Sequence, residues 1–108
     1  MNDRQYVEAA RGLAARTLTE ANAQDVASRA TWMFRLATSR APSKDDLSDI
    51  LALLKSGHDE FTRNPASAKS LIAIGDQAPD KNIDPIKLAT WTLVANLILN
   101  LDEVITKG

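Results

Sequence analysis

The sequence contains no cysteine, one histidine and few aromatic residues, which make up 5% of its 108 residues. Without cysteine the chain has no disulfide, thiolate metal site, cysteine nucleophile or covalently attached c-type haem. No apolar run reaches the length of about eighteen residues that a membrane-spanning helix needs, so we expect no membrane insertion. The charged, amphipathic start, MNDRQYVEAAR, is unlike a signal peptide.

Charge of one sign is not in excess either. The net charge is −1, and the first forty residues hold six basic and four acidic residues, a local charge of only +2. Residues 41–63 carry −2 and residues 64–108 carry −1. Nucleic-acid-binding domains usually present a continuous basic surface, and this charge distribution hardly supplies one. We therefore expect no nucleic-acid partner.

The most informative segment of the chain is Asp84–Lys107, DPIKLATWTLVANLILNLDEVITK. Asp84-Pro85 is a typical helix start, and the residues from Leu88 to Leu101 are almost all apolar. A helix that is apolar around most of its circumference must be surrounded by other elements. The pattern predicts a central helix against which the rest of the chain packs.

Four more helices are predicted by apolar residues at three-and-four spacing and by their end signals. The first begins at a cap on Asn2 or Asp3 and reaches residue 21, and the second begins near Asp25 and ends within 39–42. Ser43 and Asp46 resemble a capping box that opens the third, and Asn64-Pro65 opens the fourth. Gly75 suits a left-handed cap before a loop at 76–84. We thus predict an all-α fold, a compact bundle of about five helices wrapped around the apolar C-terminal helix.

The same spacing predicts which side chains face the core. The inner face expected for the second helix comprises Val26, Ala30, Met33, Phe34 and Ala37, with Trp32 and Leu36 on its flanks. The stripe expected for the third helix comprises Leu47, Ile50, Leu51, Leu54, His58 and Phe61. We expect His58 to be packed or half-exposed rather than a ligand or general base, because neither neighbouring turn offers a second metal-binding side chain.

Charged residues supply the candidate functional positions. Asp102 and Glu103 end the apolar helix, where negative charge is unfavourable to the helix dipole, so we expect an arginine of the first two helices to compensate. The arginines considered are Arg11, Arg16, Arg35 and Arg40, and Glu8 is expected to form a local surface pair with Arg11. The candidate interaction or structural ion-pair residues are Arg11, Arg35, Arg40, Asn100, Asp102, Glu103 and Trp32. We assign no catalytic residue, cofactor-binding residue or metal ligand.

Three segments carry a resemblance to a known family: NDRQYVEAARGLA, FRLATSRAPSKDDL and the final DPIKLATWTLVANLILNLDEVITK. In this order they resemble the closing part of a planctomycete-specific domain of unknown function. That domain ends long secreted proteins that also carry a cytochrome-c-like haem module. The matching positions are Asn2, Asp3, Tyr6, Glu8, Arg11, Phe34, Arg35, Arg40, Pro42, Asp84, Pro85, Trp91, Asn100, Leu101, Asp102 and Glu103. Arg4 replaces a proline of the family pattern, and Thr38-Ser39 replaces a pair resembling Leu-Gly.

The resemblance implies that residues 1–108 are a single helical domain, the excised C-terminal subdomain of a larger periplasmic or secreted protein. It implies no cofactor in this chain, with haem elsewhere in the parent. The leading hypothesis is a non-catalytic module that packs against the rest of its parent or a partner protein, with Leu53, Trp32 and Val104 as exposed apolar candidates. The alternative is a ligand-binding or catalytic domain built on the arginine and carboxylate residues near NLDE.

Overall fold

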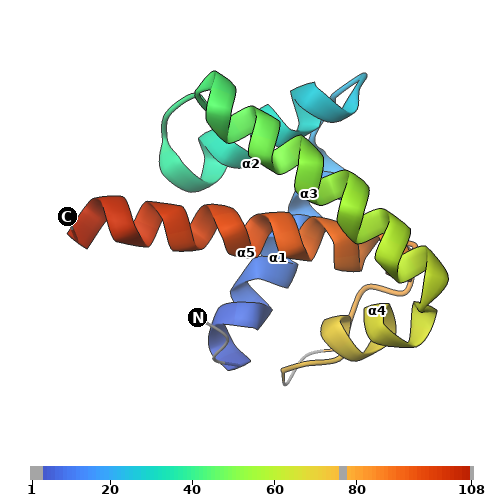
Figure 1. The fold of residues 1–108 in the computed structure, drawn as a ribbon. Coiled ribbons are helices and arrows are strands. Elements are labelled where there is room, and N and C mark those ends of the chain that lie inside the picture. Colours follow the sequence, from blue (N-terminus) through green and yellow to red (C-terminus); the bar gives the residue numbers. More distant parts are fainter. Residues whose placement is uncertain (1–3, 76–77, 108) are drawn as a thin grey trace.

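The computed structural model describes residues 4–75 and 78–107, which form five helices and the segments that join them (Figure 1). The helices are α1 (Arg4–Glu20), α2 (Val26–Thr38), α3 (Lys44–Arg63), α4 (Pro65–Ile72) and α5 (Pro85–Lys107). No strand occurs within these ranges. The prediction of an all-α bundle of about five helices is confirmed.

Helix α5 lies at the centre of the bundle, as its composition predicts. Each of the other four helices packs against it, and α1 does so most extensively. Its buried side chains include neighbouring residues as well as residues three or four positions apart, so the helix is covered on more than one face. They are Leu88, Ala89, Trp91, Val94, Ala95 and Ile98. In Figure 1 α5 passes between α3 on one side and α1 on the other.

Two buried threonines in α5 satisfy their hydroxyl groups within the helix itself. Thr90 donates to the Ile86 carbonyl and Thr92 to the Leu88 carbonyl, each at 2.7 Å. A buried hydroxyl without such a bond would be unfavourable. The threonines can therefore lie in the core without a partner from another helix.

Small residues allow the helices to approach α5 closely. Ala10 and Ala14 of α1 are fully buried. On α3 the close approach occurs at Gly57, where a Cβ atom would lie 3.0 Å from Leu93 Cδ1. A side chain at this position would require Leu93 to shift.

Two helix starts follow the predicted capping signals, whereas the cap predicted at Asn2 or Asp3 lies outside the described residues. Asp25 caps α2 by accepting from the Ser28 N–H at 2.7 Å. Ser43 and Asp46 form the reciprocal capping box of α3, with both hydrogen bonds at 3.0 Å. Ser39, the residue after α2, is its left-handed cap with φ of 63°. The prediction that Gly75 caps the fourth helix is wrong, because α4 ends at Ile72 with Ala73 as its cap, although Gly75 itself has a left-handed φ of 112°. These local signals fix most helix boundaries to within a residue or two.

Three predicted orientations are wrong. Val26, the first residue of α2, is 51% exposed. His58 is exposed, and the neighbouring Gly57 faces α5 instead. Leu53 packs against the core, and the exposed large apolar side chains of the described residues are Val26, Leu36 and Ile74.

Candidate functional site

Arg11 is a buried contact between α1 and the end of α4. Only 7% of the residue is exposed, and its Nη1 donates to the carbonyls of Ile72 and Ile74, the latter at 3.2 Å. Carbonyls at the end of a helix lack partners within the helix, and positive charge is favourable there. The expectation that Arg11 lies on the surface is wrong, since its acceptors come from residues more than sixty positions later in the chain.

Arg40 lies at the corner between α2 and α3. Its Nη1 is 3.5 Å from Asp46 Oδ2, and its guanidinium carbon lies 4.8 Å from the centroid of the Phe34 ring. Arg16, the fourth arginine considered, pairs with Glu20 one turn later at 3.1 Å. Both arginines thus have carboxylate partners on or next to their own helices.

The other candidate residues are distributed over the molecule. Arg35 is exposed, whereas Trp32 and Asn100 are half-buried. The side chains of Asp102 and Glu103 lie outside the described residues, so their predicted ion pair with an arginine stays a prediction. Arg11 and Leu88 line one cleft, and twelve residues of helix, about 18 Å, separate Leu88 from Asn100. Arg11 and Asn100 therefore do not belong to one site.

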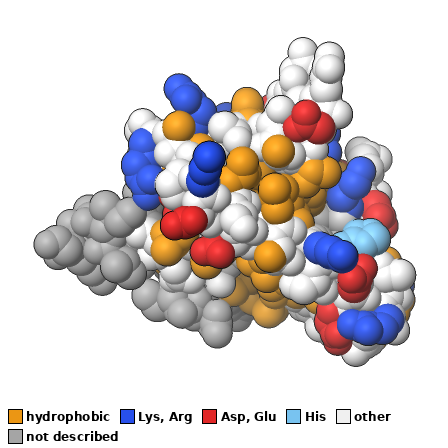
Figure 2. All heavy atoms as spheres, turned by 45° about the horizontal axis from the view of Figure 1, so that its top comes forward, with side chains coloured by type: hydrophobic (Ala, Val, Ile, Leu, Met, Phe, Trp, Pro, Cys, Tyr) orange, Lys and Arg blue, Asp and Glu red, His pale blue; other side chains and the backbone are white. Residues whose placement is uncertain are grey.

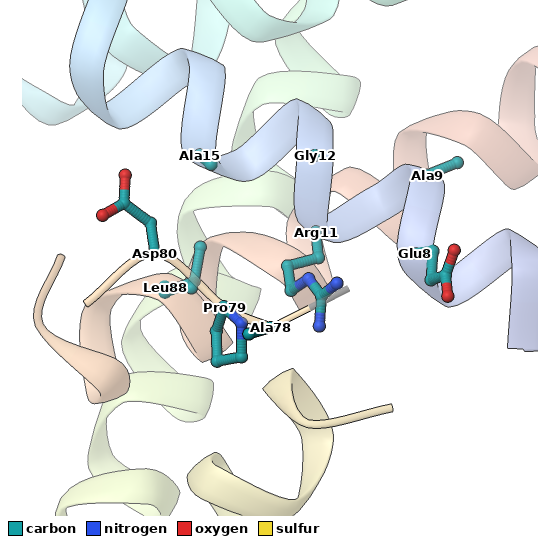
Figure 3. Close-up of a pocket in the computed structure, with 9 residues that line it drawn as sticks. All are labelled: Glu8, Ala9, Arg11, Gly12, Ala15, Ala78, Pro79, Asp80 and Leu88. Atoms are coloured by element: carbon teal, nitrogen blue, oxygen red, sulfur yellow. The ribbon is translucent and has the colours of Figure 1, made fainter. Parts of the chain in front are cut away.

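The cleft beside Arg11 lies between α1 and the segment before α5 (Figure 3). Its volume is about 420 Å³, and small side chains make up much of its wall. Arg11 extends from α1 toward Ala78 and Pro79, whereas the Asp80 carboxylate points away from it. Because Arg11 is engaged with the end of α4, this cleft is best explained as the junction of α1 with α4 and the following segment.

A second cleft, which we call the basic groove, lies among α2, α3 and α5. It has a volume of about 430 Å³, is open to solvent and has a mainly apolar lining. Its lining residues are Val26, Arg29, Leu51, Leu54, Lys55, His58, Asp59, Lys87, Thr90 and Trp91. Each of the three helices contributes at least one apolar side chain and one cation.

Charge in the basic groove is predominantly positive. Three lysine or arginine residues line it, against one carboxylate, Asp59. Figure 2 shows hydrophobic side chains gathered on this face beside the pale-blue histidine, with charged side chains around them. None of the three cations forms a salt bridge with a described carboxylate, unlike Arg16, Arg40 and Arg63.

The pKa shifts among the described residues arise from helix caps and local pairs. The Ser28 backbone N–H lowers the pKa of Asp25, and the Ser43 backbone N–H, assisted by Arg40, lowers that of Asp46. A hydrogen bond from Arg16 lowers the pKa of Glu20. These carboxylates are held ionised for structural reasons, and none of them lines the basic groove.

A third, smaller cleft of about 320 Å³ lies between α4 and the start of α5. Arg35, Arg40 and Asn100 line none of the three clefts. Among the described side chains, no group of three histidine, aspartate or glutamate residues could hold a metal ion. No described helix combines the length and apolarity needed to cross a membrane.

Comparison with known proteins supplies no relative: no family model, curated protein or solved structure matches this chain. The candidate site therefore rests on the geometry of the chain itself.

The basic groove was not predicted from the sequence. Its lysines, Lys55 and Lys87, lie 32 positions apart on different helices, and each alone resembles an ordinary solvated charge. The apolar spacing predicted that His58 and Val26 lie on inner helix faces. Both residues instead line the basic groove. Only the packing of three helices brings these residues together.

Proposed function

We propose that this chain is a non-catalytic helical interaction module of a larger secreted protein, of the cytochrome-c-associated planctomycete kind that the sequence resembles. In this proposal its partner is the remainder of the parent protein. The chain itself holds no cofactor, and any haem belongs to the parent.

The observation that carries the proposal is the basic groove. The core of the bundle holds fully buried side chains such as Phe34, Met33 and Ile50. Above that core, apolar side chains and unpaired cations remain accessible together on one face. An accessible apolar patch rimmed by polar groups is typical of interaction surfaces.

The ligand-binding or catalytic alternative requires a polar pocket that unites Arg35, Arg40 and Asn100 with the NLDE carboxylates. Arg40 instead pairs with Asp46 and stacks on Phe34. Arg11 of α1, which does not share a site with Asn100, donates to carbonyls at the end of α4. The described residues thus favour structural roles for these two arginines.

A titration tests the proposed function. The purified chain is mixed with the separately produced part of the protein that its gene encodes upstream, and binding is followed by calorimetry. We expect saturable association at a 1:1 ratio without turnover of any small molecule. Absence of association at about 100 μM, which corresponds to about −5.5 kcal/mol of binding free energy, would contradict the proposal.

A further inference from the structure

Three cations in the basic groove come from three different helices. Arg29 belongs to α2, Lys55 to α3 and Lys87 to α5, and all three line the same opening. Within the described part of the chain, none of these side chains makes a hydrogen bond or a salt bridge. Cations that converge without partners favour an anionic ligand.

Arg29 is the most informative of the three. The residue is half-buried, and its Nε is fully buried without an acceptor among the described residues. A buried donor of a charged group is unfavourable when it is unpaired. A carboxylate in the groove would pair with the part of the Arg29 guanidinium that lines the opening, because the guanidinium fork matches carboxylate geometry.

The floor of the basic groove is apolar. Val26 is 51% exposed at one side and Leu51 of α3 is half-buried, while Trp91 of α5, only 5% exposed, lies at the base. Small-molecule sites usually enclose most of their ligand. This groove is open to solvent, and its cations are spread over three helices, which favours an extended protein segment.

We propose that the basic groove binds an acidic, apolar segment of the remainder of the parent protein, in which carboxylates flank two or three large apolar side chains. The apolar side chains contact the floor around Leu51 and Trp91. The flanking carboxylates pair with Lys55, Lys87 and Arg29. This inference rests on the proposed function and adds to it the location of the interface and the chemistry of the partner.

Selection from a random library of displayed peptides, each about twelve residues long, tests the inference with the intact chain as bait. We expect the enriched peptides to combine aspartate or glutamate with leucine, isoleucine, phenylalanine or tryptophan. Their binding should weaken as NaCl is raised from about 50 to about 500 mM, because salt screens exposed charge pairs. No enrichment, or enrichment of neutral or basic peptides, would overturn the inference.

Charge reversal then locates the binding site. The double substitution Lys55→Glu/Lys87→Glu should weaken binding of the selected peptides about tenfold or more, since it turns two attractions into repulsions. Lys44→Glu/Lys81→Glu makes the same change in net charge away from the groove and should have little effect. Lys55→Arg/Lys87→Arg should retain binding. Equal weakening by both charge-reversed pairs would show non-specific attraction and overturn the inference.

The two proposals can fail separately. If the chain binds the upstream part of its parent and Lys55→Glu/Lys87→Glu leaves that affinity unchanged, the location and chemistry proposed here are wrong and the interaction module stands. If nothing upstream binds, the proposed function fails. Circular dichroism of each variant verifies that the exposed substitutions leave the helical fold intact.

Discussion

Replacing Arg11 by methionine should lower the free energy of unfolding by about 2–4 kcal/mol. Methionine keeps much of the apolar stem of arginine, so packing against α1 and α4 is largely preserved. What is lost is the charged donor to the carbonyls of Ile72 and Ile74. The substitution therefore tests the contact that joins α1 to the end of α4.

The magnitude follows from the burial and the number of these bonds. A hydrogen bond from a charged donor contributes about 1.5–3 kcal/mol, and the guanidinium donates to two carbonyls. Its favourable position at the end of α4 adds about 0.3–1 kcal/mol. Water can reach part of the site after the substitution and recovers some of this, which gives a net loss of about 2–4 kcal/mol.

Urea denaturation followed by circular dichroism measures this loss. For a domain of this size, each kcal/mol corresponds to about 4–8 °C in melting temperature, so thermal unfolding should show a shift of about 10–25 °C. Arg16→Met is the matched control, because Arg16 lies on the same helix and forms a solvent-exposed pair with Glu20. Its unfolding curve should coincide with that of the parent chain.

Equal stability of the Arg11→Met and Arg16→Met variants would refute the reasoning. It would show that Arg11 does not hold α4 against α1, and that its burial has another explanation. Intermediate stability of Arg11→Lys would support it, because lysine keeps the charge but lacks the forked donor geometry.

Four further predictions concern single sites. Ser39→Gly should raise the free energy of unfolding by about 0.5–1 kcal/mol in urea denaturation, because Ser39 has φ of 63° and glycine adopts this conformation without strain. Because the Ser43 backbone N–H lowers the folded-state pKa of Asp46, this carboxylate adds stability above its unfolded pKa of about 3.9 that is lost as the pH falls through the folded pKa. The stability difference from Asp46→Asn should therefore shrink on acidification in a urea series, and a constant difference would contradict this. Gly57→Val should lower the melting temperature by the equivalent of about 1–3 kcal/mol, since Leu93 occupies the space its side chain needs. Gly12→Ala, where a Cβ meets nothing within 4 Å, should raise the melting temperature slightly.

Local signals in the sequence determined much of the fold. Asp25 and Ser43 define the starts of α2 and α3 through hydrogen bonds to nearby residues, and Pro65 defines the start of α4 through its backbone geometry. Because each signal involves only a few neighbouring residues, these helix starts can be predicted from a single sequence. The central position of α5 was also predictable, because its apolar residues surround the helix. These features need no knowledge of which helices pack together.

The candidate site could not be predicted in the same way. Whether Arg11 is exposed depends on carbonyls contributed by a helix more than sixty residues later. Whether Val26 and His58 face inward depends on how α2 and α3 pack against α5, which periodicity alone does not determine. The basic groove exists only because three separate helices converge, and no short motif encodes that arrangement.

The most direct test of the proposed interface is zero-length carbodiimide crosslinking of the complete protein that the gene encodes, followed by mass spectrometry. This reagent joins a lysine only to a carboxylate that already contacts it. The account predicts that Lys55 or Lys87 becomes linked to an aspartate or glutamate outside residues 1–108. Links from Lys44 or Lys69 to the rest of the protein, with none from Lys55 or Lys87, would contradict it.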